Sequence, residues 1–158
     1  MRVLFGVFAL LFIQLTFSTD ALALIEDENS IAIIMEAWGT GVDNKSMLKT
    51  LRNLKEAGVD DKDIGRMVKA GGTGADSSAY LRTYFNLVKE DINAGARGRL
   101  IEKWGTGADN GSLLRGFHSV ADQGVNDHEA IARLINTFGT GADNPAVVNT
   151  FLRVRDLP

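Results

Sequence analysis

Apolar residues recur at helical spacing along most of the chain. Ile31, Ile34, Met35 and Trp38 follow the i, i+3, i+4, i+7 order of one helical face, which predicts a helix over residues 28–38. Longer stripes of the same kind follow at four places: Met47, Leu48, Leu51 and Leu54; Tyr80, Leu81, Tyr84 and Leu87; Leu113, Leu114, Phe117 and Val120; and Val147, Val148, Phe151 and Leu152. Shorter stripes alternate with these. The pattern predicts eight amphipathic helices, alternately short and long, beginning with a short one and ending with a long one over residues 145–156.

A seven-residue motif separates each short helix from the long helix that follows. It reads Trp-Gly-Thr-Gly-Val-Asp-Asn at 38–44 and returns, with changes, at 71–77, 104–110 and 138–144. Its first glycines are spaced by 33, 33 and 34 residues, a period typical of helix-turn-helix arrays. We assign these residues to a structural repeat motif: Trp38, Gly39, Gly41, Asp43, Gly72, Gly74, Asp76, Trp104, Gly105, Gly107, Asp109, Phe138, Gly139, Gly141 and Asp143. The sequence therefore predicts one all-α repeat domain, either a short α-solenoid or a closed helical bundle.

Pro145 indicates where the long helices begin, because proline is favoured at the first helical position, directly after a capping residue. By alignment, the capping residues are Asn44, Ser77, Asn110 and Asn144. We expect the first glycine of each motif to end a helix, and the aromatic residue before it to plug the seam between helices. The second repeat departs from this pattern. Gly71 replaces the aromatic residue, and Gly95 and Gly98 fall inside an expected helix, which should be the weakest.

Three ligand-binding interpretations of the motif compete with the structural one. Glycine-rich turns before a helix can bind phosphate, but here an Asp sits in the turn and no Walker-type Lys follows. A calcium site, loosely as in annexins, needs six to eight oxygens, whereas each turn offers one Asp and carbonyl groups. A row of equivalent turns could also bind a partner along one edge. The structural interpretation explains most letters of the motif, so we expect no bound cofactor or metal.

The first 23 residues have the pattern of a secretory signal peptide. Arg2 precedes a nearly unbroken apolar run over residues 3–17, and Ala21-Leu22-Ala23 forms a small-x-small cleavage site. We therefore expect residues 1–23 to be removed and residues 24–158 to form the helical domain. The apolar run is short for a membrane span, and no later stretch approaches about 20 apolar residues. No membrane association is expected after cleavage.

Composition and candidate chemistry narrow the function. A net charge of −3 does not suggest a nucleic-acid-binding surface, and the absence of cysteine leaves stability to packing alone. His118 and His128 do not occupy equivalent repeat positions, and no catalytic triad or metal cluster is apparent, so we expect no enzyme. The best candidate for a partner-binding face is a basic set on the polar side of the first long helix: Lys45, Lys49, Arg52 and Lys55.

The chain resembles the secreted effectors of oomycete plant pathogens, specifically the helical WY-type group. The leader, from Met1-Arg2-Val3-Leu4 to Ala23, looks like the leaders of that group, although no Arg-x-Leu-Arg follows it. Trp38 and Trp104, each followed by a hydrophobic helix, are similar to the W motif of the group. Tyr80, Tyr84 and Phe85 look like its Y motif, and the segment Glu26-Asp27-Glu28 resembles the acidic element behind the leader.

This resemblance implies a WY-like helical module that is secreted and enters the cytoplasm or nucleus of a host cell. There it would bind a host protein and suppress defence without catalysis of its own. Two other hypotheses remain open from the residues. The chain could be a calcium- or membrane-binding module of annexin type, or an extracellular structural repeat protein.

Overall fold

A computed structural model describes residues 25–157 and confirms the all-α class. Over these residues it contains eight α-helices, four 3-10 turns and no strand. In chain order the elements are α1 (Glu28–Trp38), η1 (Gly39–Asp43), α2 (Lys45–Glu56), α3 (Asp61–Gly71), η2 (Gly72–Gly74), α4 (Ser78–Lys89), α5 (Ala96–Trp104), η3 (Gly105–Gly107), α6 (Gly111–Asp122), α7 (His128–Phe138), η4 (Gly139–Gly141) and α8 (Pro145–Arg155). The leader predicted over residues 1–23 lies outside the described residues.

The expected alternation of short and long helices is present but weak. Helices α1, α3 and α7 have 11 residues and α5 has 9, whereas α2, α4 and α6 have 12; the last helix, α8, has 11 residues and is no longer than α7. The odd-numbered helices begin earlier than their apolar stripes because an Asp caps each of three of them. Asp27, Asp60 and Asp127 accept hydrogen bonds from backbone N–H groups of the first turn. Asp127 caps α7, although the similarity of Gly-Val-Asn-Asp at 124–127 to Gly-Val-Asp-Asp at 58–61 predicts Asn126 as the cap.

The even-numbered helices begin where Pro145 predicted. Asn44, Asn110 and Asn144 each accept a hydrogen bond from the backbone N–H two residues later. Ser77 occupies the same position before α4, but its side chain makes no capping hydrogen bond. Three of the four predicted caps thus act through their side chains.

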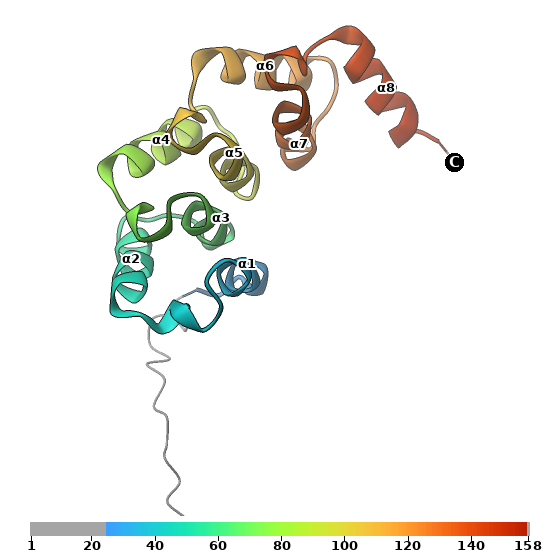
Figure 1. Ribbon diagram of the computed structural model, residues 1–158. Helices are drawn as coiled ribbons and strands as arrows, with labels where there is room; N and C mark the ends of the chain where they lie inside the picture. The colour runs from blue at the N-terminus through green and yellow to red at the C-terminus, as the bar shows by residue number, and fades with distance from the viewer. Residues whose placement is uncertain (1–24, 158) are drawn as a thin grey trace, which may run out of the picture.

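The odd-numbered helices form a consecutive stack in which α1 packs on α3, α3 on α5, and α5 on α7. Figure 1 shows these inner helices along the inside of an open arc, with the outer helices α2, α4, α6 and α8 along its rim. Outer helices contact the turn of the next unit, as α2 contacts η2 and α6 contacts η4. The turns therefore hold the rim apart while the inner helices approach closely, and the array curves.

Small residues allow the close approach of the inner helices. A Cβ atom on Gly65 of α3 would lie 2.5 Å from the main-chain oxygen of Ser30 in α1. One on Gly98 of α5 would lie 3.1 Å from the Cα atom of Asp63 in α3. Neither distance leaves room for a side chain, so glycine at these two positions sets the spacing of the stack.

The prediction that Gly95 and Gly98 both lie inside a helix of the second repeat is wrong for Gly95 and confirmed for Gly98. Gly95 does not lie inside a helix: it precedes α5, with φ of 84°, a conformation that favours glycine. Gly98 does lie inside α5, where it is needed for contact with α3. The two glycines that signalled a weak helix are thus requirements of its packing.

Candidate functional site

The four turns share one backbone geometry. Gly39, Gly72, Gly105 and Gly139 have φ between 52° and 58°, and the N–H of each donates to the carbonyl four residues earlier. This left-handed conformation explains why glycine stands at each of these positions. The second glycine of the motif, such as Gly41, is also free to take positive φ, but at none of the four positions does it do so, and a Cβ there would meet open space.

The Asp of the motif binds the preceding outer helix. Asp76 accepts hydrogen bonds from Asn53 Nδ2 at 2.5 Å and from Thr50 Oγ1 at 3.5 Å. Asp109 repeats the arrangement one unit later, with Asn86 Nδ2 at 2.7 Å and Thr83 Oγ1 at 3.4 Å. Each threonine hydroxyl also lies within hydrogen-bond distance of the carbonyl oxygen of the motif threonine, Thr73 or Thr106. These two aspartates therefore act as bridges between units.

The third junction uses a different bridge. Gly116 and Ser119 occupy the positions of the threonine and asparagine of the earlier outer helices. Instead, the side-chain amide of Gln123 donates from Nε2 to the main-chain carbonyl of Asp143 at 3.1 Å. Over residues 25–157 there is also no group of three His, Cys, Asp or Glu side chains arranged to hold a metal ion.

The motif aromatics do not plug the seams as predicted. Trp38 and Trp104 are 37% exposed and Phe138 is 50% exposed. A Cβ on Gly72 would lie 3.1 Å from the Trp38 ring, and one on Gly139 would lie 3.9 Å from the Trp104 ring. Each Trp thus lies over the first glycine of the next turn and covers its backbone from the solvent side. The lack of a side chain on that glycine leaves room for the ring beside the turn.

Tyr80 replaces the aromatic residue that is absent at position 71. Its ring lies 3.0 Å from where a Cβ on Gly71 would be, and its hydroxyl donates to the carbonyl of Ala70 at 3.2 Å. The same hydroxyl lies 3.5 Å from a Cβ built on Gly105, the first glycine of the next turn. An aromatic side chain from α4 therefore covers this junction in place of one from α3.

A buried charged centre that was not predicted from the sequence lies between α3 and α5. The Asp63 side chain is fully buried and accepts hydrogen bonds from the backbone N–H groups of Gly95 at 2.7 Å and Gly98 at 2.8 Å. Arg97 Nε donates to its other oxygen at 3.0 Å. Burial raises the pKa of Asp63, and the guanidinium charge with these three hydrogen bonds opposes that rise.

Arg97 connects this centre to the outer helix α4. Its guanidinium donates to the Tyr84 hydroxyl at 3.1 Å and to the Ile92 carbonyl at 2.7 Å. The Tyr84 hydroxyl also accepts the backbone N–H of Asp60 at 2.9 Å. The alignment did contain a signal for the centre, since Asp63 stands where the other inner helices have Ser30 and Ala96. A charge in a column of small residues predicts a buried partner.

Ion pairs along the inner helices link successive units. Glu102 lies 2.5 Å from Arg66 and 3.2 Å from Lys69, and Arg99 lies 2.7 Å from Glu129. Partial burial would raise the pKa of Glu102, but hydrogen bonds from Arg66 and Lys69 and their charges outweigh it and hold the pKa below its ordinary value.

The predicted basic face is exposed except at one position. Lys45, Lys49 and Arg52 of α2 are exposed, whereas Lys55 is half-buried and pairs with Asp61 of α3. Lys55 therefore helps to hold α2 against α3. Arg82 in α4 and Arg115 in α6 occupy the same position in their units as Lys49, five residues after the cap, and both are exposed.

We call Lys45, Lys49, Arg52, Arg82 and Arg115 the basic row. Its members lie on three outer helices that succeed one another along the rim of the arc (Figure 1). Lys49, Arg52 and Arg82 form no ion pair with any residue between 25 and 157, and Arg115 donates to the hydroxyl of Ser112 on its own helix. The charge of this row is therefore available to a partner.

The histidines have structural contacts. His118 Nε2 lies 3.0 Å from Glu90, and His128 Nδ1 accepts the backbone N–H of Asn93 at 3.2 Å. Both rings meet Phe117 edge to face, with centroids 5.9 Å and 5.3 Å away. The two side chains thus join neighbouring elements around one buried aromatic ring.

Comparison with known proteins yields no relative on which to base a function. No family model, no curated protein and no solved structure matches the chain. In the part of the chain that the structure describes, no helix is long and apolar enough to cross a membrane. A function must therefore be inferred from the surfaces of this molecule.

Proposed function

We propose that the protein is a non-catalytic binding protein whose basic row contacts an acidic surface of a partner protein. The observation that carries this proposal is the presence of exposed basic side chains at one repeat position in three successive units. Lys49, Arg82 and Arg115 share this position, and Lys45 and Arg52 widen the row on α2.

The rigid frame below the row supports this role. The Asp76 and Asp109 bridges attach α2 and α4 to the turns that follow them, so these helices cannot rotate freely against the stack. Charges held at a repeated spacing make an extended surface that can be complementary to a row of carboxylates. Such complementarity contributes chiefly to the association rate and to selectivity, and it weakens as salt is added.

The resemblance to WY-type effectors supplies the biological setting of the proposal. In that setting the protein is secreted by a pathogen, enters a plant cell and binds a host protein, and the complex suppresses defence. The internal hydrogen bonds of Asp76 and Asp109 favour this hypothesis over the annexin-type one, because these carboxylates already have protein partners.

The proposal is tested by charge reversal on the rim against charge reversal elsewhere. Lys49→Glu with Arg82→Glu changes the basic row, while Lys62→Glu with Lys103→Glu makes the same change in net charge at exposed positions of inner helices. Each protein is expressed in leaf tissue together with an immune elicitor, and the defence output is measured at equal protein levels.

We expect the wild-type protein and the inner-helix variant to lower the defence output, and the rim variant to lose most of this effect. Equal effects of the two variants would refute the basic row as the binding surface. No effect of the wild-type protein would refute the effector function itself.

A further inference from the structure

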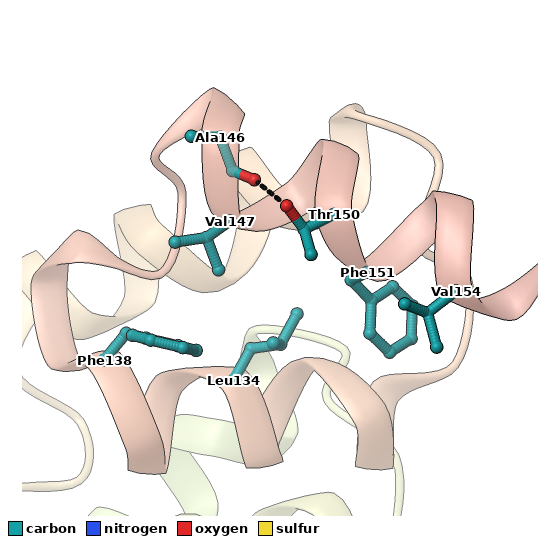
Figure 2. A pocket seen from close by; sticks show the side chains of 7 residues that line it. All are labelled: Leu134, Phe138, Ala146, Val147, Thr150, Phe151 and Val154. Carbon is teal, nitrogen blue, oxygen red and sulfur yellow. Dashed lines mark hydrogen bonds between the residues drawn. The ribbon is translucent and has the colours of Figure 1, made fainter.

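The last unit of the array has an apolar face that earlier units bury. In α2, Met47, Leu51 and Leu54 are fully buried. The corresponding residues of α8 are Val147, Phe151 and Val154, and Val154 is 62% exposed. Figure 2 shows these three side chains facing Leu134 and Phe138 of α7 across an open apolar groove, which we call the C-terminal groove. In the interior units this space is filled by the next inner helix and its turn.

The first inner helix has the complementary face. Met35 of α1 is 41% exposed, whereas Val68, Ile101 and Ile135 at the same position of the later inner helices are fully buried. Ala32 is exposed as well, although Gly65, Gly98 and Ala132 at its position are buried against the preceding inner helix. Helix α1 thus presents the side that every later inner helix packs on the unit before it.

We propose that the protein associates head to tail, with α1 and η1 of a second copy seated in the C-terminal groove. The described array begins with an inner helix and ends with an outer helix, so α8 of one copy and α1 of the next together form one complete unit. The interface continues the junction that already joins α2 to α3, α4 to α5 and α6 to α7. This inference does not depend on the basic row or on the effector function.

Polar residues at the two ends match in the same register. Thr150 of α8 occupies the position of Thr50 and Thr83, whose hydroxyls bond to the turn of the next unit. In the monomer its hydroxyl instead donates to Ala146 O of its own helix at 2.7 Å. Asp43 of η1 is exposed and has no outer helix before it among the described residues. Asp43 of the second copy would therefore accept from Thr150 as Asp76 accepts from Thr50.

An ion pair and an aromatic contact follow the same register. Arg133 of α7 and Glu36 of α1 are both exposed and correspond to Arg66 and Glu102, which pair at 2.5 Å between α3 and α5. Across two copies Arg133 would thus face Glu36. Phe138 would lie over Gly39 of the second copy, as Trp38 lies over Gly72 within one chain.

Because the two contacting faces differ, the association is heterologous. Such contacts produce closed rings where the rotation between copies closes, and open filaments otherwise. A heterologous contact also has a diagnostic property that a two-fold dimer lacks. Blocking either face stops growth, but two proteins blocked at opposite faces still pair once.

The test uses three single substitutions at exposed apolar positions, which leave the buried core unchanged. Val154→Asp blocks the groove, Met35→Asp blocks α1, and Val88→Asp is the matched control on α4, where the side chain is 40% exposed and far from both ends. Circular dichroism verifies that each variant is folded. Sedimentation velocity across a range of concentrations then measures the mass of each purified protein.

We expect the wild-type protein and Val88→Asp to gain mass with concentration, while Val154→Asp and Met35→Asp each stay monomeric. An equal mixture of these two blocked variants should form a dimer that does not grow further. A wild-type protein that stays monomeric at all concentrations would overturn the proposal. So would assembly of Met35→Asp alone, which would indicate a symmetric contact between two grooves, or the absence of a dimer in the mixture.

The ion pair provides an independent check on the register. Arg133→Glu should weaken association by roughly two- to fivefold, the range of an exposed pair. Glu36→Arg in the same chain should restore it, because the charges are then exchanged between the two ends. Failure of the second substitution to restore association would overturn the proposed register.

Discussion

Replacing Asp63 by alanine is the most direct test of how the inner stack is held together. The substitution removes a fully buried carboxylate and leaves the Gly95 and Gly98 N–H groups without their acceptor. It also leaves the guanidinium of Arg97, whose side chain is 12% exposed, without its counter-charge. Three donors between α3 and α5 thus lose their partner at once.

The expected cost follows from the geometry of this centre. Removing one member of a buried ion pair typically costs about 3–5 kcal/mol, because the other charge stays buried and uncompensated. Asp63→Asn keeps an oxygen for the two N–H groups but sets its amide against Arg97. Since burial already disfavours the carboxylate and raises its pKa, we expect the smaller loss of about 1–2 kcal/mol for asparagine.

Urea denaturation of the purified proteins, followed by circular dichroism, measures both losses. Arg97→Met, alone and combined with Asp63→Ala, completes a double-mutant cycle, and we expect the combined variant to be more stable than Asp63→Ala alone. A loss below about 1 kcal/mol for Asp63→Ala would refute the role of the centre, since that is the range of ordinary exposed substitutions. Should Asp63→Ala fail to fold, Asp63→Asn and the double variant still provide the comparison.

Other parts of the array are tested by smaller perturbations. Gly98→Ala places a methyl group 2.8 Å from a buried carboxylate oxygen and should lower the free energy of unfolding in urea by about 1–3 kcal/mol. The control Gly107→Ala meets open space and should lower it by less than about 0.5 kcal/mol. Equal losses would contradict the close approach of α3 and α5. Asp109→Ala removes the bridge to α4 and should cost about 1–2 kcal/mol, while Asp43→Ala should leave the monomer unchanged. The pKa of Glu102 in the folded protein lies below its ordinary value of 4.5, so its ion pairs contribute stability near neutral pH. This stability is lost as the pH falls through the folded pKa. Glu102→Gln should therefore remove this part of the pH dependence of the free energy of unfolding.

The repeat motif predicted the fold because its information is local. A glycine that ends a helix at positive φ, and an Asn or Pro that begins the next, act within a few residues of their own position. Their recurrence therefore located the turns and predicted the helix count. The helix predicted over residues 28–38 agrees with α1, but the apolar stripes alone do not show where the inner helices begin, because the capping Asp of α1, α3 and α7 lies about one turn before the stripe.

Contacts between units could not be predicted in the same way. The partner of Asp63 depends on which residues of α3 and α5 meet in the stack, a register that Gly98 sets from the opposite helix. The contact of the Trp38 ring depends likewise on Gly72, a residue of the following unit. Tyr80 fills the place left by Gly71 from a different helix, which no alignment of equivalent positions reveals.

The same letter of the motif has different consequences at different places in the array. Inside the array Asp76 and Asp109 accept hydrogen bonds from the preceding outer helix, so the repetition of this residue is explained by packing between units and does not require a ligand. At the ends, Asp43 and Thr150 stand at the same positions without the neighbouring unit that would satisfy them. Residues that depart from the repeat, and repeat residues that lack their neighbour, are therefore where interactions with other molecules should be sought. The two end faces belong to the second kind of position, whereas the basic row follows the repeat itself, with Lys49, Arg82 and Arg115 at one position of three successive units.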